Sequence, residues 1–230
     1  MPLLTDTERE ALLLSLDVAL RSVLCSLPFA IGAAWLLTRR RVPGRLLLDA
    51  VVHLPLVLPP VVVGYVLLLL FGVRGPLGGW LDAHFGIRLV FTTAGAALAT
   101  AVMAFPLMVR SVRIALEGVD RGLEDAARSL GAGALDRFCS VTLPLMLPGV
   151  LAGAVTAFAA ALGEFGAVIT FVGNVPGETR TLPLALYTVL QTPGGDAAAA
   201  RLATLSLLLG VGGLLLAELL ARGLRRRLGR

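Results

Sequence analysis

Five stretches of this chain are apolar over about 20 residues or more, the length that a helix needs to cross the roughly 30 Å hydrocarbon core of a bilayer. They cover residues 11–37, 46–71, 91–109, 145–171 and 199–221. The chain is 57% hydrophobic and 15% charged, with a mean hydropathy of +0.88, which is far too apolar for a soluble domain. The sequence therefore predicts an all-α integral membrane protein with five transmembrane helices. It would form a single domain over residues 1–230, with its core at about 11–221.

All twenty basic residues are arginine, and they are distributed unequally around the apolar stretches. Fourteen follow the first, third and fifth stretches, whereas five flank the opposite ends. The remaining one, Arg21, lies inside the first stretch, four residues after Asp17, with which it can pair on one helix face. Because cytoplasmic loops have an excess of basic residues, the asymmetry predicts an N-terminus outside and a C-terminus in the cytoplasm. The arginines form no continuous stripe, so membrane lipid and not nucleic acid is the expected contact.

Two further apolar segments, residues 77–85 and 182–191, are too short to cross a bilayer. As helices each would extend only about 15 Å, half of the hydrocarbon thickness. Glycine and proline bound both segments, at Gly75-Pro76 and Gly86 and at Pro176-Gly177 and Pro193-Gly194. We expect short helices there, lying on or dipping into the outer face.

The second apolar stretch contains Pro55, Pro59 and Pro60. Proline has no N–H group, so it leaves backbone carbonyls without a hydrogen-bond donor and bends a helix. Broken membrane helices commonly line transport paths, although a purely structural kink is the alternative. The fourth stretch contains Glu164, a carboxylate that needs a partner such as Arg180 or Arg201 and that suits a gate or a structural pair. The candidates for the pathway or its gate are Pro55, Pro59, Pro60, Glu164, Thr170 and Arg180.

The residue types of the chain indicate that the chain itself neither catalyses a reaction nor binds ATP. No lysine is present, so the chain cannot form a normal P-loop, and no hydrolase or paired-carboxylate motif occurs. Cys25 and Cys139 have no metal-ligand spacing, and His53 and His84 lie in separate segments. We expect a protein that is not an enzyme and that binds no cofactor or metal.

A polar interruption at residues 113–144 is predicted to be a cytoplasmic loop with a short helix. Leu123, Ala126, Ala127 and Leu130 share one face of that helix at the spacing i, i+3, i+4 and i+7. Glu117 with Arg121 and Glu124 with Arg128 are spaced to pair on its polar faces. Gly131 supplies the unhindered backbone that a helix end and a sharp turn require.

The spacing within this loop resembles the docking loop of the permeases of ABC importers. It runs from Asp125-Ala126-Ala127 to Gly131, four residues on, and then to Val141-Thr142-Leu143-Pro144, which begins ten residues after that glycine. Beyond the loop, the chain resembles the permease subunits of molybdate ABC importers from near its N-terminus to its last span. The segments that carry this resemblance are residues 54–64, 105–110, 115–120, 162–167 and 177–183.

The resemblance implies a type I ABC importer permease in the inner membrane of a bacterium, moving molybdate by alternating access. It implies a homodimer with two separate ATPase subunits and a periplasmic oxyanion-binding protein. Tungstate is an alternative substrate, a sulfate or other oxyanion permease is the rival within the class, and a stand-alone channel or secondary transporter is the rival outside it. The positions that would couple to the ATPase are Leu123, Glu124, Asp125, Ala126, Ala127, Leu130 and Gly131.

Overall fold

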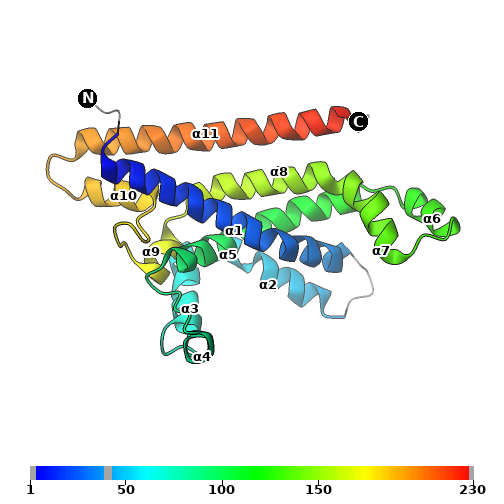
Figure 1. The fold of residues 1–230 in the computed structure, drawn as a ribbon, viewed down its shortest axis with the longest axis horizontal. Helices are drawn as coiled ribbons and strands as arrows, with labels where there is room; N and C mark the ends of the chain where they lie inside the picture. Colours follow the sequence, from blue (N-terminus) through cyan, green and yellow to red (C-terminus); the bar gives the residue numbers. More distant parts are fainter. Residues whose placement is uncertain (1–3, 39–42, 228–230) are drawn as a thin grey trace.

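Four long helices lie side by side and form the body of the molecule in this computed structural model, which describes residues 4–38 and 43–227 (Figure 1). They are α1 (Asp6–Thr38), α5 (Thr93–Glu117), α8 (Leu143–Leu162) and α11 (Asp196–Arg227). Helix α5 packs against α1 and α8, and α8 in turn packs against α11. The part of the chain that the structure describes contains helices and connecting turns but no strand.

Small residues bring α5 and α8 close together, as the glycine-rich sequence of the fourth stretch suggests. A Cβ atom on Gly153 of α8 would lie 2.8 Å from the Cβ atom of Ser111 in α5. The apolar core beside this contact includes Met108, Val112 and Met146, all of which are almost completely buried. Because lipid supplies no hydrophobic force between helices, such close contact is what holds these spans together.

The number of spans agrees with the expectation of five, but the second one is not straight. Four described helices are long and apolar enough to cross a membrane, and a bent pair brings the number to five. The pair consists of α2 (Arg45–Val57) and α3 (Pro60–Phe71), which are bent by 118° at Leu58 and Pro59. Leu58 is extended and neither Pro59 nor Pro60 has an N–H group to continue the helix. The predicted break of the span at residues 46–71 is confirmed.

The fourth span begins and ends earlier than predicted, at Ala134 and Leu162. Helix α8 ends at Leu162, and after the turn at residues 163–165 the short helix α9 (Gly166–Val172) begins. The expected continuous span of residues 145–171 is therefore wrong. Hydropathy alone cannot reveal this break, because the residues on both sides of it are apolar.

The two breaks lie against each other, because α3 packs on α9. A Cβ atom on Gly64 would lie 2.6 Å from the carbonyl oxygen of Ala167 and 2.8 Å from Cβ of Thr170. A Cβ atom on Gly166 would lie 2.8 Å from Cβ of Pro60. Two glycines thus allow the backbones that follow the two breaks to touch.

The remaining helices lie around the body. Helix α10 (Leu182–Leu190) lies beside the beginnings of α1 and α11, at the opposite end from α6 (Arg121–Ser129) and α7 (Ala134–Arg137) (Figure 1). Helix α4 (Pro76–Phe85) is at the tip of α3, to the side of the four long helices. Both short segments are helical as expected. The 118° bend carries α3, with α4 at its tip, away from the bundle. That α4 lies on the outer face of the membrane therefore stays a prediction.

Candidate functional site

The polar loop forms helix α6, which is closed at both ends by local hydrogen bonds. Asp120 precedes the helix, and its side chain accepts a hydrogen bond of 2.8 Å from the N–H group of Gly122. At the other end Gly131 has a φ of +89°, and its N–H group donates to the carbonyl of Arg128. The N–H group of Ala132 donates to the carbonyl of Ala127, which completes a Schellman motif. The turn expected at Gly131 is confirmed.

The apolar face of α6 is not covered by the rest of the chain. Leu123 is 46% exposed and Leu130, the residue that ends the helix, is 89% exposed. Asp125 and Ala126 are exposed and Ala127 is half-buried. A stripe of leucine and alanine that remains open to solvent is suited to a partner that approaches closely.

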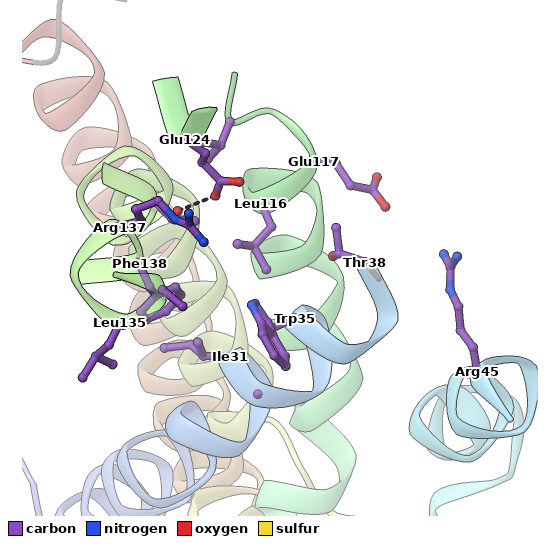
Figure 2. A pocket seen from close by; sticks show the side chains of 14 residues that line it. Ile31, Trp35, Thr38, Arg45, Leu116, Glu117, Glu124, Leu135, Arg137 and Phe138 are labelled. Carbon is purple, nitrogen blue, oxygen red and sulfur yellow. Dashed lines mark hydrogen bonds between the residues drawn. The ribbon is translucent and has the colours of Figure 1, made fainter. Parts of the chain in front are cut away.

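Glu124 joins the two halves of the loop motif. Its carboxylate accepts a hydrogen bond of 2.6 Å from the hydroxyl of Thr142, shown as a dashed line in Figure 2. Thr142 ends the π-helical turn Phe138–Thr142 that leads into α8. Glu124 therefore fixes α6 to the base of a membrane span instead of forming the predicted pair with Arg128. Glu117 binds Arg113 at 3.0 Å, whereas the side chain of Arg121, its predicted partner, is outside what the structure describes.

A cavity of about 1230 Å³ separates this loop from the ends of α1 and α5. Trp35, Leu116 and Phe138 form apolar parts of its wall, and Glu124 and Arg137 form polar parts (Figure 2). This cavity could not be predicted from the sequence, because its wall comes from segments that are far apart in the chain. Of α6, only Glu124 lines this space, and the helix packs against α7 and the turn Phe138–Thr142 instead of against α1 or α5.

The pathway candidates gather mainly around the paired breaks. Pro59 and Pro60 begin α3 and are exposed, whereas Pro55 lies half-buried one turn earlier, inside α2. Thr170 packs beside Gly64 and donates a hydrogen bond of 2.7 Å to the carbonyl of Gly166. Five of the six candidates thus lie on the two broken spans, and Arg180 lies elsewhere, in the loop before α10.

Glu164 has a different partner from those expected. Its carboxylate accepts a hydrogen bond of 2.9 Å from the N–H group of Ala167 and so caps α9. Arg180 donates to the side chain of Asn174 at 2.9 Å. Arg201 binds Glu8 at 2.9 Å. Both predicted ion pairs of Glu164 are therefore wrong, because its carboxylate accepts from a free N–H group at the start of α9 and the two arginines bind Asn174 and Glu8.

The end of the molecule that holds α10 is fastened by polar contacts that the sequence did not reveal. The carboxylate of Glu8, which is 5% exposed, ties α1 to Arg201 in α11. About two turns further along α1, the hydroxyl of Ser15 accepts a hydrogen bond of 2.6 Å from the N–H group of Leu182 in α10. Each contact joins residues more than 160 positions apart, so the three helices are fixed to one another. The local pair of Asp17 with Arg21 is confirmed at 2.8 Å.

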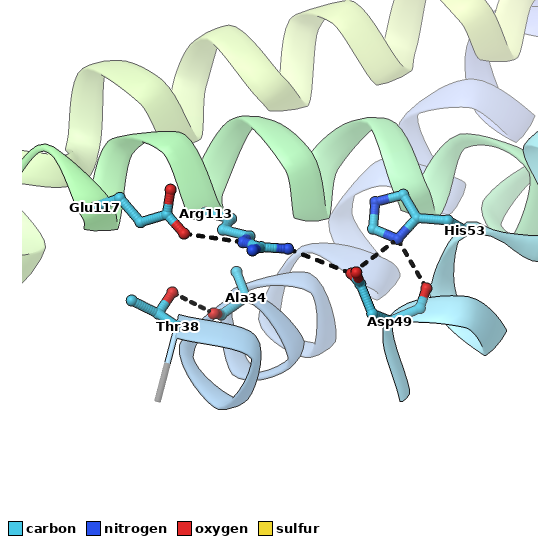
Figure 3. A network of polar contacts seen from close by, with 6 residues as sticks. All are labelled: Ala34, Thr38, Asp49, His53, Arg113 and Glu117. Atoms are coloured by element: carbon cyan, nitrogen blue, oxygen red, sulfur yellow. Dashed lines mark hydrogen bonds and ion pairs between the residues drawn. The ribbon is translucent and has the colours of Figure 1, made fainter. Parts of the chain in front are cut away.

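A third polar group connects α2 to α5 at the end where α6 lies (Figure 3). Arg113 binds Asp49 at 3.3 Å and Glu117 at 3.0 Å, so one guanidinium serves two carboxylates. The imidazole Nδ1 of His53 lies 3.3 Å from the same carboxylate oxygen of Asp49. Within the described ranges, no group of three or more His, Cys, Asp or Glu side chains is arranged to hold a metal ion.

Comparison with known families identifies this arrangement. The model of the family described as "binding-protein-dependent transport system inner membrane component" matches residues 26–226. The chain belongs to this family. It is an inner membrane component of a transport system that depends on a binding protein, and it crosses the cytoplasmic membrane several times.

Two molybdenum permeases are similar over almost the whole chain, and a sulfate permease is similar over a smaller part of it. The molybdenum transport system permease protein ModB of Escherichia coli strain K12 is 60% identical over 228 residues, which cover 99% of this chain and 100% of that protein. ModB of Haemophilus influenzae is 52% identical, covering 96% and 97%. The sulfate transport system permease protein CysT of Escherichia coli strain K12 is 42% identical, covering 79% and 66%.

Solved structures support the same fold for this inner membrane component. A bacterial ABC transporter involved in the import of alginate matches with a TM-score of 0.75 over 95% of this chain and 80% of that one, at 18% identity. The MetNI methionine ABC transporter matches with a TM-score of 0.65 over 94% and 99%, also at 18% identity. At this identity the likeness concerns the fold, which is that of the type I ABC importer permeases.

Proposed function

We propose that this chain is the permease subunit of an ATP-driven importer that moves molybdate across the cytoplasmic membrane by alternating access. The observation that carries the proposal is the 60% identity to a molybdenum permease over almost all of both chains. The chain itself would hydrolyse nothing. Two ATPase subunits, a second copy of the chain and a periplasmic oxyanion-binding protein would complete the transporter.

The ATPase would dock on α6. The exposed stripe of Leu123, Ala126, Ala127 and Leu130 would enter a groove of the ATPase, and the turn at Gly131 would lead the chain away from that surface. Glu124 would act within the permease by passing movement of α6 to Thr142 and hence to α8. In this arrangement Asp125, which is exposed, remains available to polar groups of the partner.

Replacing Ala127 with Glu tests the docking surface. A buried charge without a partner costs a few kcal/mol, so we expect loss of ATPase co-purification and of uptake in vesicles. Ser129→Glu adds the same charge two residues on, away from the stripe, and should retain both. If Ala127→Glu retains ATPase binding and uptake, α6 is not the docking site.

The paired breaks would form the moving part of the pathway. Pro55, Pro59 and Pro60 would shape one wall, and Thr170 would lie on the other, where α9 touches α3. Glu164 would serve as a structural cap at this gate, because its carboxylate already satisfies an N–H group of α9. Arg180 would stabilise the outer loop through Asn174 and would not touch the substrate during passage.

Sulfate and tungstate are the alternative substrates, because tetrahedral dianions of similar size make similar contacts. The lower identity to the sulfate permease, and the smaller share of that protein that is matched, favour molybdate. A strain that lacks this chain should lose molybdate-dependent enzyme activity at trace molybdate and regain it at high external molybdate. Normal molybdenum uptake together with failed sulfate uptake in that strain would assign the chain to sulfate.

A further inference from the structure

Five polar side chains form a stripe where α2 runs beside α5, and we refer to them as the inner polar stripe. They are Asp49, His53, Arg110, Arg113 and Glu117. Asp49 and His53 are one turn apart on α2, whereas the other three follow one another along one side of α5 at spacings of three and four residues. The ion pair of Asp49 with Arg113 fixes the two helices at the same level (Figure 3).

The stripe reaches into the thickness of the membrane. Arg110 follows Thr93, the first residue of α5, by seventeen positions, which corresponds to about 25 Å along the helix. In a hydrocarbon core of roughly 30 Å, Arg110 therefore lies near the inner boundary, and His53 extends the stripe toward the middle from Asp49. Charged groups at this depth normally face protein or a water-filled cavity and not lipid tails.

The protein packed around the stripe does not bury it. The side chains of Arg113, His53 and Asp49 are 27%, 30% and 39% exposed. Arg110 is exposed, and its neighbour Ile114 is 63% exposed. Helix α11 differs, since its exposed face presents a run of apolar side chains, as contact with lipid requires. That run contains Leu207, Leu208, Val211, Leu214 and Leu215.

The positive and negative charges of the stripe nearly balance, but its two arginines differ in their ionic partners. Arg113 is engaged by Asp49 and Glu117, whereas no carboxylate among the described residues pairs with Arg110. A guanidinium presents several N–H donors in one plane and is well suited to the oxygen atoms of a dianion. Passage also requires weak binding, so that the ion leaves again, and the two nearby carboxylates limit the attraction.

We propose that the inner polar stripe lines the water-filled inner part of the translocation pathway, and that Arg110 contacts the oxyanion as it leaves toward the cytoplasm. Arg113 is a positioning residue that holds α2 beside α5 through Asp49. The substrate part of this inference rests on the proposed function. The exposure of the stripe to water does not, and it can be measured separately.

The first measurement is access of water-soluble reagents to the stripe. In a chain with Cys25→Ala and Cys139→Ala, His53→Cys lies about 12 Å along α2 from Arg45 and should react with a charged, membrane-impermeant thiol reagent added to the cytoplasmic side of inside-out vesicles. Leu208→Cys in α11 is the matched control, as it is 64% exposed but should face lipid and should not react. If His53→Cys is as unreactive as Leu208→Cys, the stripe does not line an aqueous path and the inference fails.

The second measurement concerns Arg110. Removing a charge-assisted contact in Arg110→Gln should lower molybdate uptake per ATP hydrolysed about tenfold, whereas ATPase binding is retained. Arg110→Lys keeps the positive charge and should restore most of the uptake. If Arg110→Gln takes up molybdate like the wild type, Arg110 does not contact the substrate. If the wild-type complex takes up no molybdate in the same vesicles, the proposed substrate is wrong, while the labelling of His53→Cys still decides whether the stripe is accessible to water.

Discussion

At the scale of single residues, the site depends on backbone geometry and on carboxylates that find unexpected partners. Gly131 adopts a φ of +89°, which an L side chain reaches only with strain. Glu124 and Glu164 both accept hydrogen bonds from groups of the loop or helix that they hold in place, the hydroxyl of Thr142 and the N–H group of Ala167. Neither carboxylate binds the arginine that the sequence analysis predicted as its partner.

Gly131→Val should weaken coupling through the turn after α6. A β-branched residue at a φ of +89° costs roughly 1–2 kcal/mol, so the Schellman turn should open and α6 should lose its orientation. We expect less ATPase co-purification and lower uptake, with normal membrane insertion. Gly133→Ala is the matched control, because Gly133 has a φ of −66° and open space around its Cα atom. Equal activity of the two variants would show that the conformation of Gly131 is irrelevant to coupling.

Glu164→Leu and Glu164→Gln together distinguish a cap from a charged gate. Leucine leaves the N–H group of Ala167 without an acceptor, at a cost of about 1–3 kcal/mol, so the melting temperature of the purified protein should fall. Glutamine keeps an acceptor oxygen and should retain most of the stability and uptake. If the glutamine variant is stable but abolishes uptake, the negative charge itself is required and Glu164 acts as more than a cap.

At the scale of elements, the decisive feature is the contact between α3 and α9, each of which follows a break in a membrane span. Prolines produce one break, and the turn at residues 163–165 produces the other. Gly64 and Gly166 permit the close approach, so that the segments after the two breaks pack as one unit. A pathway built on such a unit can change shape at the breaks without losing the packing between α3 and α9.

Gly64→Ala should disturb this unit. The added Cβ atom would lie 2.6 Å from the carbonyl oxygen of Ala167, so α3 and α9 must separate, with an expected cost of about 1–3 kcal/mol. We predict a lower melting temperature and reduced uptake. Gly210→Ala in α11 makes the same change in open space and should leave both unchanged. An unchanged melting temperature for Gly64→Ala would mean that the contact is not tight in the membrane.

At the scale of the whole molecule, the two ends are built differently. Buried polar contacts fasten α1, α10 and α11 at one end, among them the ion pair of Glu8 with Arg201. At the other end, a large cavity separates α6 from α1 and α5, and the hydrogen bond that Glu124 accepts from Thr142 links the loop to the start of α8. This difference places the adaptable part of the molecule beside the proposed ATPase surface.

The orientation in the membrane is tested by reporter fusions. A reporter fused after Arg230 should lie in the cytoplasm, and one inserted within residues 173–178 should lie outside, as the fourteen-to-five distribution of arginines predicts. Each fusion should be checked for retained uptake, so that misinserted chains are recognised. Reports from the same compartment for both fusions would contradict the five-span topology.

The sequence by itself determined the membrane class, the number of apolar spans, the break at Pro59 and the turn at Gly131. These properties are local, because they follow from the hydropathy of consecutive residues and from the backbone angles that proline and glycine favour. Only the tertiary structure decided the 118° direction of the second span and the early end of α8. It alone decided the partners of Glu124 and Glu164 as well, because a hydrogen bond requires two groups within about 3 Å and spacing along the chain does not determine that distance.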